Sequence, residues 1–274
     1  MVFRKNIIYF LILLNLTVWL AVFSVDSSLK IIACDVGQGD AILIQKNTTQ
    51  ILIDGGPNQS VLNCLGRHMP FWDKQIEMVI LTHPQEDHYG GLIDVFKSYK
   101  IVNFGENNTN SSNRGYEVLK NLVGGSGATT ISLTDGTVIK AGMMQLDILW
   151  PLVNIASNKN SQFSSNVNDD GVVILLKHAQ FKALFTADVE NVVSNTLSGR
   201  IEIQNIDYIK VNHHGSKNGM SQNLLNVANP EIAVISVAAK NRYGHPHAEI
   251  IKMLTEKGVK ILRTDEVGDV VMTK

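Results

Sequence analysis

At 274 residues, the chain is long enough for one large hydrophobic core or for two modest domains. An apolar content of 45% with 18% charged residues excludes a largely disordered chain. The formal net charge of −1 gives no sign of a nucleic-acid surface, although a local basic groove is compatible with a neutral total. Two cysteines, Cys34 and Cys64, are too few for a disulfide framework, and we expect a buried thiol rather than a bridge.

The N-terminal segment differs from the rest of the chain. Residues 7–25 carry no charge and follow Arg4 and Lys5. The run approaches the ~20 residues that span a bilayer and exceeds the apolar region of a signal peptide, about 7–15 residues. We therefore predict an uncleaved signal anchor over residues 1–28, with the body, residues 29–274, outside the cytoplasmic membrane. A cleaved signal peptide and a secreted body are the alternative.

The body is predicted to alternate short strands with helices. Its first part should contain strands at 30–36, 40–45, 50–53 and 77–81, and helices at 59–68, 92–99 and 116–123. A strand-rich block then covers 129–150, and a long polar loop covers 154–170. The last part should contain strands at 172–176, 181–186, 206–211, 232–237, 260–262 and 269–272, and helices at 189–197, 222–228 and 250–257. Two halves of this kind predict two sheets with helices outside them.

The end of the strand at 77–81 carries the strongest chemical signal. The apolar run stops before His83, and Asp87 and His88 follow on the same short segment. Imidazole nitrogens and carboxylate oxygens are the donors that a zinc-like or manganese-like ion prefers. We therefore predict a metal-binding turn, the alternative being a polar turn that merely contains two histidines.

Four further strand ends carry donors of the same kind. Each follows an apolar run and holds a carboxylate or a pair of histidines. Polar side chains at the ends of several strands should converge on one edge of the sheets. A single strand-end aspartate such as Asp54 is about as often a turn or helix cap. The residues concerned are Asp54, Asp188, His213, His214, His245 and His247.

With these segments in view, the chain resembles the metallo-β-lactamase fold superfamily, and within it the metallo-hydrolase domain of ComEC-type DNA-uptake competence proteins. The resemblance covers nearly everything after residue 30, in the same order. It implies an α+β fold, a four-layer αββα sandwich with metals at one edge, preceded here by one N-terminal transmembrane helix. The matching segments are DVGQGDA at 35–41, LIDGG at 52–56, THPQEDHYGG at 82–91, LFTADVE at 184–190, VNHHGS at 211–216 and KNRYGHPH at 240–247.

The resemblance also implies roles for these residues. His83 would serve a first metal position, Asp87 and His88 a second, and Asp188 would bridge the two. Of the histidine pair, His213 is the favoured ligand. The implied ligand set is His83, Gln85, Asp87, His88, Asp188, His213 and His214, with Asp54 and Asp35 supporting it without touching the metal.

Two features depart from the family pattern. The middle donor of the metal turn is Gln85, a weaker ligand than the usual histidine or the aspartate of competence relatives. The usual third histidine is missing, so the first metal position is expected to be weaker than the second. One or two divalent ions, Zn or Mn, are implied, and oxygen donors favour Mn. Candidates to replace the missing histidine are Asn166, Asn168, Asp169 and Asp170.

The implied activity is hydrolysis by a metal-activated hydroxide. We expect a phosphodiesterase acting on single-stranded DNA or another phosphodiester, with Asp87 in the reaction centre. His245 or His247 would donate to the leaving oxygen or orient a phosphate, although packing at a helix start also explains that pair. The alternatives are a hydrolase of a small ester, lactone or amide, and a binding relative that has lost turnover.

Overall fold

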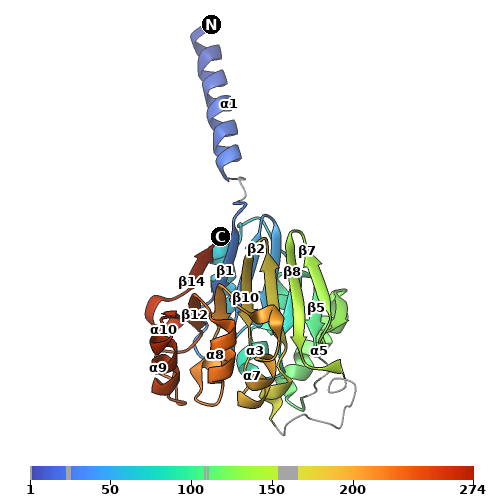
Figure 1. Ribbon diagram of the computed structural model, residues 1–274. Coiled ribbons are helices and arrows are strands. Elements are labelled where there is room, and N and C mark those ends of the chain that lie inside the picture. Colours follow the sequence, from blue (N-terminus) through green and yellow to red (C-terminus); the bar gives the residue numbers. More distant parts are fainter. Residues whose placement is uncertain (1, 23–25, 108, 110, 154–165) are drawn as a thin grey trace.

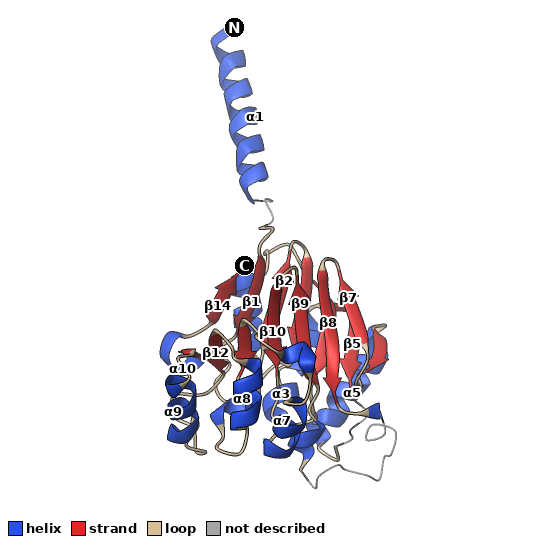
Figure 2. Ribbon diagram, viewed as in Figure 1, coloured by secondary structure: helices blue, strands red, loops and turns tan. Residues whose placement is uncertain are grey.

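The computed structural model describes residues 2–22, 26–107, 109, 111–153 and 166–274. Two seven-stranded sheets lie face to face, and helices cover their outer surfaces (Figures 1 and 2). The predicted α+β architecture of two sheets enclosed by helices is therefore confirmed.

The first sheet has the strand order β14-β1-β2-β3-β4-β5-β6. Strands β14, β1, β2 and β3 pair antiparallel, whereas β3 to β6 pair parallel. The strands are β1 (Leu29–Ala33), β2 (Ile42–Lys46), β3 (Thr49–Ile53), β4 (Gln75–Leu81), β5 (Lys100–Glu106), β6 (Thr129–Ser132) and β14 (Val270–Thr273). The helices of this half are α2 (Ser60–His68), α3 (Glu86–Tyr89), α4 (Leu92–Ser98) and α5 (Arg114–Ser126).

The second sheet has the order β13-β12-β11-β10-β9-β8-β7. Its strands are β7 (Val138–Ala141), β8 (Met144–Trp150), β9 (Val173–His178), β10 (Phe181–Phe185), β11 (Tyr208–Lys210), β12 (Ile232–Ile235) and β13 (Lys260–Arg263). The helices of this half are α7 (Asn191–Leu197), α8 (Gln222–Ala228), α9 (Ala248–Glu256) and α10 (Thr264–Val267). The described residues of this half also contain the short 3₁₀ helices η1 (Val167–Asp170), η2 (Ile201–Ile203) and η3 (Asn212–Gly215).

The alternation of side chains along the strands produces the layers. In β1, Ile31 and Ala33 belong to the core between the sheets, whereas Ile32 and the following Cys34 pack toward the helices of the first sheet. A strand buried on both faces needs apolar residues at successive positions, which explains the unbroken run at the end of β4. A third cluster lies between the second sheet and its helices.

Most predicted elements have a counterpart within a few residues, and the helix at 222–228 coincides with α8. Strand β5 was not predicted. A polar residue, Asn103, interrupts its apolar pattern, and the Asn103 side chain donates a hydrogen bond of 2.9 Å to the Glu77 carbonyl of the neighbouring strand. Of the predicted polar loop, residues 154–165 lie outside the described part, and η1 occupies 167–170.

The prediction of a free buried thiol is wrong, because Cys34 and Cys64 form a disulfide. Both are almost fully buried, and the bond joins the end of β1 to α2. Thirty residues separate the cysteines in the sequence, so only the packing of α2 on the first sheet shows that their Cα atoms lie 5.8 Å apart.

The apolar N-terminal segment forms helix α1 (Val2–Val22), which projects from the sandwich (Figure 1). Large apolar side chains along it are exposed, among them Tyr9, Phe10 and Leu13. Within the described residues, no helix is both long enough and apolar enough to cross a membrane. The structure thus does not support the predicted transmembrane signal anchor.

Candidate metal centre

Four turns, two from each sheet, meet at one rim of the sandwich. Strands β3 and β4 are parallel neighbours, so Asp54 after β3 and Thr82 after β4 emerge side by side. In the second sheet β10 and β11 are parallel neighbours, and their ends deliver Asp188 and the η3 turn to that rim. The shared strand direction explains why residues distant in sequence gather here.

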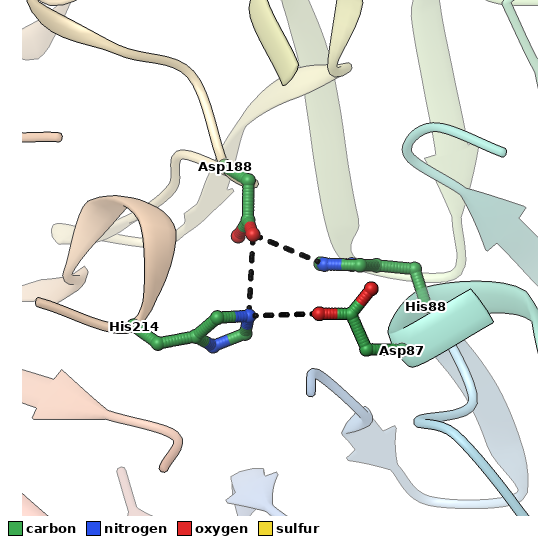
Figure 3. Close-up of side chains that lie close together, drawn as sticks. All are labelled: Asp87, His88, Asp188 and His214. Atoms are coloured by element: carbon green, nitrogen blue, oxygen red, sulfur yellow. Dashed lines mark ion pairs between the residues drawn. The ribbon is translucent and has the colours of Figure 1, made fainter. Parts of the chain in front are cut away.

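Four side chains converge at this rim and form what we call the four-ligand group: Asp87, His88, Asp188 and His214 (Figure 3). One potential ligand atom from each lies within 4.8 Å of the others. Asp188 Oδ2 is 3.3 Å from His88 Nε2 and 3.2 Å from His214 Nε2. Asp87 Oδ2 is 3.6 Å from the same His214 nitrogen. The arrangement offers two imidazole nitrogens and two carboxylates to one point.

The burial of these atoms fits a cation. His88 Nε2, Asp188 Oδ2 and His214 Nε2 are buried, and none has a hydrogen-bond partner. Buried polar atoms without partners are uncommon and cost free energy. A divalent ion would satisfy all three, and nitrogen and carboxylate donors suit zinc or manganese. The residues present therefore fit the divalent metal that the family resemblance implies.

Without a cation, protons balance the charges of this cluster. Burial opposes the charged form of His88, but the surrounding carboxylates, Asp188 foremost, raise its pKa well above the usual value. Burial opposes the charged form of His214 too, and Asp188 and Asp40 raise its pKa to about 9. Although burial favours the neutral acid, the charges of His214 and Lys210 hold the pKa of Asp188 well below its usual range. A bound cation would take the place of the imidazole protons.

Asp54 orients one of the ligands. Its carboxylate accepts hydrogen bonds from the backbone nitrogen of Thr82 at 2.8 Å and from the Thr82 hydroxyl at 2.7 Å. Asp54 Oδ2 also lies 2.8 Å from His88 Nδ1, so the opposite nitrogen of that ring faces the four-ligand group. A carboxylate behind a histidine ligand fixes the ring and its tautomer. Asp54 therefore contacts the His88 ring on the side opposite the four-ligand group.

Asp35 does not occupy the predicted supporting position. It is exposed, and its backbone nitrogen donates to Asp269 Oδ1 at 2.8 Å. Asp40, from the same motif, is buried instead and places Oδ1 3.6 Å from His214 Nδ1. Gly39 permits this approach, because a Cβ there would lie 2.2 Å from the Asp87 carbonyl oxygen. The Gly-rich motif therefore packs against the metal turn.

Sequence reasoning missed Lys210, which is fully buried beside the four-ligand group. Its ammonium lies 3.2 Å from Asp188 Oδ1 and also pairs with Asp40 Oδ2. It donates a further hydrogen bond to the Ala187 carbonyl at 3.0 Å. Because Lys210 holds one oxygen of Asp188, the other oxygen points at the two histidines. The sequence did contain a signal for this role, because Lys210 is a charged residue within a mostly apolar predicted strand.

Of the histidine pair, the structure brings His214 into the four-ligand group, whereas His213 was favoured from the sequence. His213 Nε2 is 3.8 Å from Asp188 Oδ2, and its other nitrogen is 3.4 Å from Glu190 Oε1. Both histidines have a left-handed backbone, with φ of 47° and 53°. This rare conformation turns His214 toward the interior, an outcome that the sequence pattern did not indicate.

The first metal position is not assembled in the same way. Gln85 Nε2 donates a hydrogen bond to Asn168 Oδ1, and Asn168 Nδ2 lies 3.5 Å from His213 Nε2. His83 is fully buried next to His88, with ring centroids 4.1 Å apart. Among the histidines, cysteines and carboxylates that the structure describes, neither His83 nor His213 belongs to a group that could hold a metal ion. Amide contacts fill the space where the family pattern has histidine.

The replacements considered for the missing histidine behave differently from one another. Asn166 accepts a hydrogen bond from the Asn168 backbone at 3.1 Å, and Asp169 accepts one from the Glu190 backbone at 2.8 Å. Asp170 Oδ1 is buried without a partner, and burial together with Asp169 raises the pKa of Asp170 to about 6. Neither Asp169 nor Asp170 joins a ligand group among the described histidines, cysteines and carboxylates.

The two remaining predicted site residues lie on the same rim. The ring centroid of His245 is 5.5 Å from that of His213 and 5.1 Å from that of His247. Burial and the charges of His214 and His213 lower the pKa of His245 to about 4. His245 is therefore neutral at neutral pH, so it suits hydrogen bonding to a substrate oxygen better than a role as a charged acid.

Comparison with known proteins agrees with this geometry. The profile of the "Metallo-beta-lactamase superfamily" matches residues 34–117. ComE operon protein 3 of Bacillus subtilis is 25% identical over 260 residues, which are 86% of this chain and 32% of that protein. Recombination protein 2 of Haemophilus influenzae is 29% identical over 238 residues, covering 80% and 26% respectively. Competence protein ComA of Neisseria gonorrhoeae is 26% identical over 244 residues, covering 85% and 30%. The chain thus spans about a third or less of these relatives.

Solved structures show the fold. YhfI of Bacillus subtilis, described as a metallo-beta-lactamase fold protein, superimposes with a TM-score of 0.61 at 13% identity, covering 90% of this chain and all of that one. Zn(2+)-bound PqqB of Methylobacterium extorquens gives a TM-score of 0.58 at 10% identity, covering 89% and 99%. The chain therefore has the metallo-β-lactamase fold and is similar in sequence to competence proteins, as the sequence resemblance predicted.

Proposed function

We propose that this protein is a metal-dependent phosphodiesterase that cuts DNA outside the cytoplasmic membrane. The four-ligand group carries the proposal, because its four donors converge on one point and those of His88, Asp188 and His214 are buried without a hydrogen-bond partner. Relatives named as competence and recombination proteins favour DNA over a small ester, lactone or amide.

Asp87, His88, Asp188 and His214 would hold one divalent ion, Zn or Mn. When bound, such an ion supplies Lewis acidity and an activated water for hydrolysis. Asp54 and Lys210 keep the ligands aimed at the ion through the hydrogen bonds and ion pairs described above. A second ion near His83 and His213 would bind more weakly, because Gln85 is already hydrogen-bonded to Asn168.

The neutral His245 contributes from the rim. Its ring lies 6.5 Å, centroid to centroid, from that of the ligand His214, and its Nδ1 has no hydrogen-bond partner. A substrate phosphate bound at the four-ligand group would come within reach of this ring. His245 then orients the phosphate or donates a hydrogen bond toward the leaving oxygen.

The disulfide supports a location outside the cytoplasm. Disulfides such as Cys34–Cys64 form and persist in oxidising compartments and are rare where cellular thiols keep cysteines reduced. We propose that residues 29–274 form the catalytic domain in such a compartment.

The test uses the purified full chain with manganese or zinc and a labelled single-stranded oligonucleotide. Asp87→Asn should abolish cleavage, whereas the matched control Asp94→Asn, a partly exposed residue of helix α4 that pairs with Lys97, should keep it. Equal cleavage by both variants would refute the proposal. Hydrolysis of small esters without DNA cleavage would favour the second class of substrate, and bound metal without any hydrolysis would favour a binding relative.

A further inference from the structure

A cavity of about 530 Å³ opens beside the four-ligand group. Asp87 and its neighbour Glu86 lie in one wall, together with Gln38 and Pro57. The loop 238–245 supplies the other wall. Its lining residues are Ala238, Lys240, Asn241, Arg242 and Tyr243. The volume is within the range of ligand sites, about 300–1,000 Å³.

Asn241 holds this loop in a fixed shape. Its side-chain nitrogen donates to the Ala238 carbonyl at 3.0 Å and to the His245 carbonyl at 2.7 Å. Its side-chain oxygen accepts hydrogen bonds from the backbone nitrogens of Tyr243 at 3.1 Å and His245 at 3.0 Å. Four hydrogen bonds from one amide preorganise the loop, which reduces the entropy lost when a ligand binds.

The loop presents positive charge to the cavity. Lys240 and Arg242 are exposed, and within the described residues neither takes part in an ion pair. Arg242 lies 5.0 Å over the Tyr243 ring and donates to its hydroxyl at 2.9 Å. Glu86, in the opposite wall, would repel an anion and so direct it toward the two cations.

Aromatic rings connect this charged loop to the metal ligands. Tyr243 is half-exposed and stacks on His245, with centroids 5.6 Å apart and an angle of 26° between the ring planes. His245 in turn lies 5.5 Å from His213. A substrate that reaches the four-ligand group along this wall passes an aromatic face and a guanidinium, both of which stack on nucleobases.

We propose that the cavity binds the single strand next to its scissile bond: Lys240 and Arg242 contact flanking phosphates, and the Arg242–Tyr243 pair stacks on an unpaired base. That the bound strand is cut next to this cavity rests on the proposed phosphodiesterase function. That the cavity binds the strand does not depend on it. The site would thus prefer a single-stranded polynucleotide to a small diester, which has no flanking phosphates, and to a duplex, whose bases are covered.

Strand binding is measured without turnover. The full chain, with a chelator present, is titrated into a fluorescein-labelled single-stranded 12-mer, and fluorescence anisotropy is followed at several salt concentrations. We expect the double variant Lys240→Ala/Arg242→Ala to bind about 10-fold more weakly. The slope of the logarithm of the binding constant against the logarithm of the salt concentration should decrease in magnitude by about 1.4, since each phosphate contact on a single strand contributes about 0.7.

A charge-matched control removes two lysines elsewhere. Lys140→Ala/Lys252→Ala changes the net charge by the same amount on exposed positions of β7 and α9 that do not line the cavity. Its affinity and slope should stay near those of the unchanged protein. Tyr243→Ala should weaken single-strand binding about 10-fold as well, because stacking on an aromatic ring contributes to each bound base. Circular dichroism checks that each variant is folded.

A second substrate separates this inference from the proposed function. With manganese, hydrolysis of bis(p-nitrophenyl) phosphate should fall much less in the double variant than cleavage of the labelled single strand does, because this small diester has no flanking phosphates. If the unchanged protein hydrolyses no phosphodiester while the binding differences hold, the proposed function fails and strand binding stands. Equal affinity and slope in both double variants, or duplex bound as tightly as single strand, would overturn strand binding.

Discussion

The two halves of the candidate metal centre differ in how their donor atoms are used. In the four-ligand group, His88 Nε2, Asp188 Oδ2 and His214 Nε2 are buried and have no hydrogen-bond partner. On the other half, the Gln85 amide is hydrogen-bonded to Asn168, and Asn168 approaches His213. One half therefore keeps anionic and imidazole donors for a cation, whereas neutral amides bond to each other in the other half. Histidines in a metal-like motif do not by themselves make a binding position.

The largest expected effect is on metal affinity, when His214 and His213 are each replaced by alanine. We expect His214→Ala to lower metal affinity by at least about 100-fold, since even residues that only support a ligand contribute 10- to 100-fold. His213→Ala should lower it by less than about 10-fold, because that side chain is half-buried and contacts Glu190. Isothermal titration with zinc or manganese measures both variants. Similar losses would mean that the two halves form one shared site.

Metal removal should have an intermediate effect on stability. An ion at 100 times its dissociation constant stabilises the folded state by about 2.7 kcal/mol, so chelation should lower the melting temperature by about 5–10 °C for a domain of this size. Differential scanning calorimetry with and without chelator gives the shift. His214→Ala should show almost no shift on chelation, while His213→Ala should retain most of it. A full shift in His214→Ala would contradict the assignment.

The smallest expected effect is a change in the free energy of unfolding, and it comes from Asp170, one of the residues near the first metal position. Its pKa is raised to about 6 by burial and by Asp169, whereas the unfolded chain titrates near the usual value. Between these pH values the folded state binds more protons, so this group makes the protein more stable as pH falls. Asp170→Asn should therefore raise the unfolding free energy at pH 7 by on the order of 1–2 kcal/mol, and much less at pH 4. Urea denaturation at both pH values tests this.

Asp170→Asn also sharpens the comparison of the two halves. Because Asp170 joins no ligand group among the described residues, elemental analysis should find unchanged metal content in this variant. A loss of metal would show that Asp170 replaces the missing histidine of the family pattern.

The sequence predicted the layers and the rim because both follow from short-range patterns. Apolar runs ending at Asp54, His83 and Asp188 were sufficient to place the donors at strand ends. The choice between His213 and His214 was not predictable, because it depends on two consecutive left-handed residues. The pairing of Cys34 with Cys64, and the contact of Lys210 with Asp188, arise only when distant elements pack together.

Lys210 has a consequence for how many ions the rim can accept. Its buried ammonium group is a positive charge that belongs to the chain itself, and it pairs with the carboxylates of Asp40 and Asp188. The first divalent ion enters surroundings that are still predominantly acidic. A second would meet the charge of both the first ion and the lysine, and electrostatic repulsion in a poorly solvated interior is strong. The charge of Lys210 would therefore disfavour a second divalent ion at this rim.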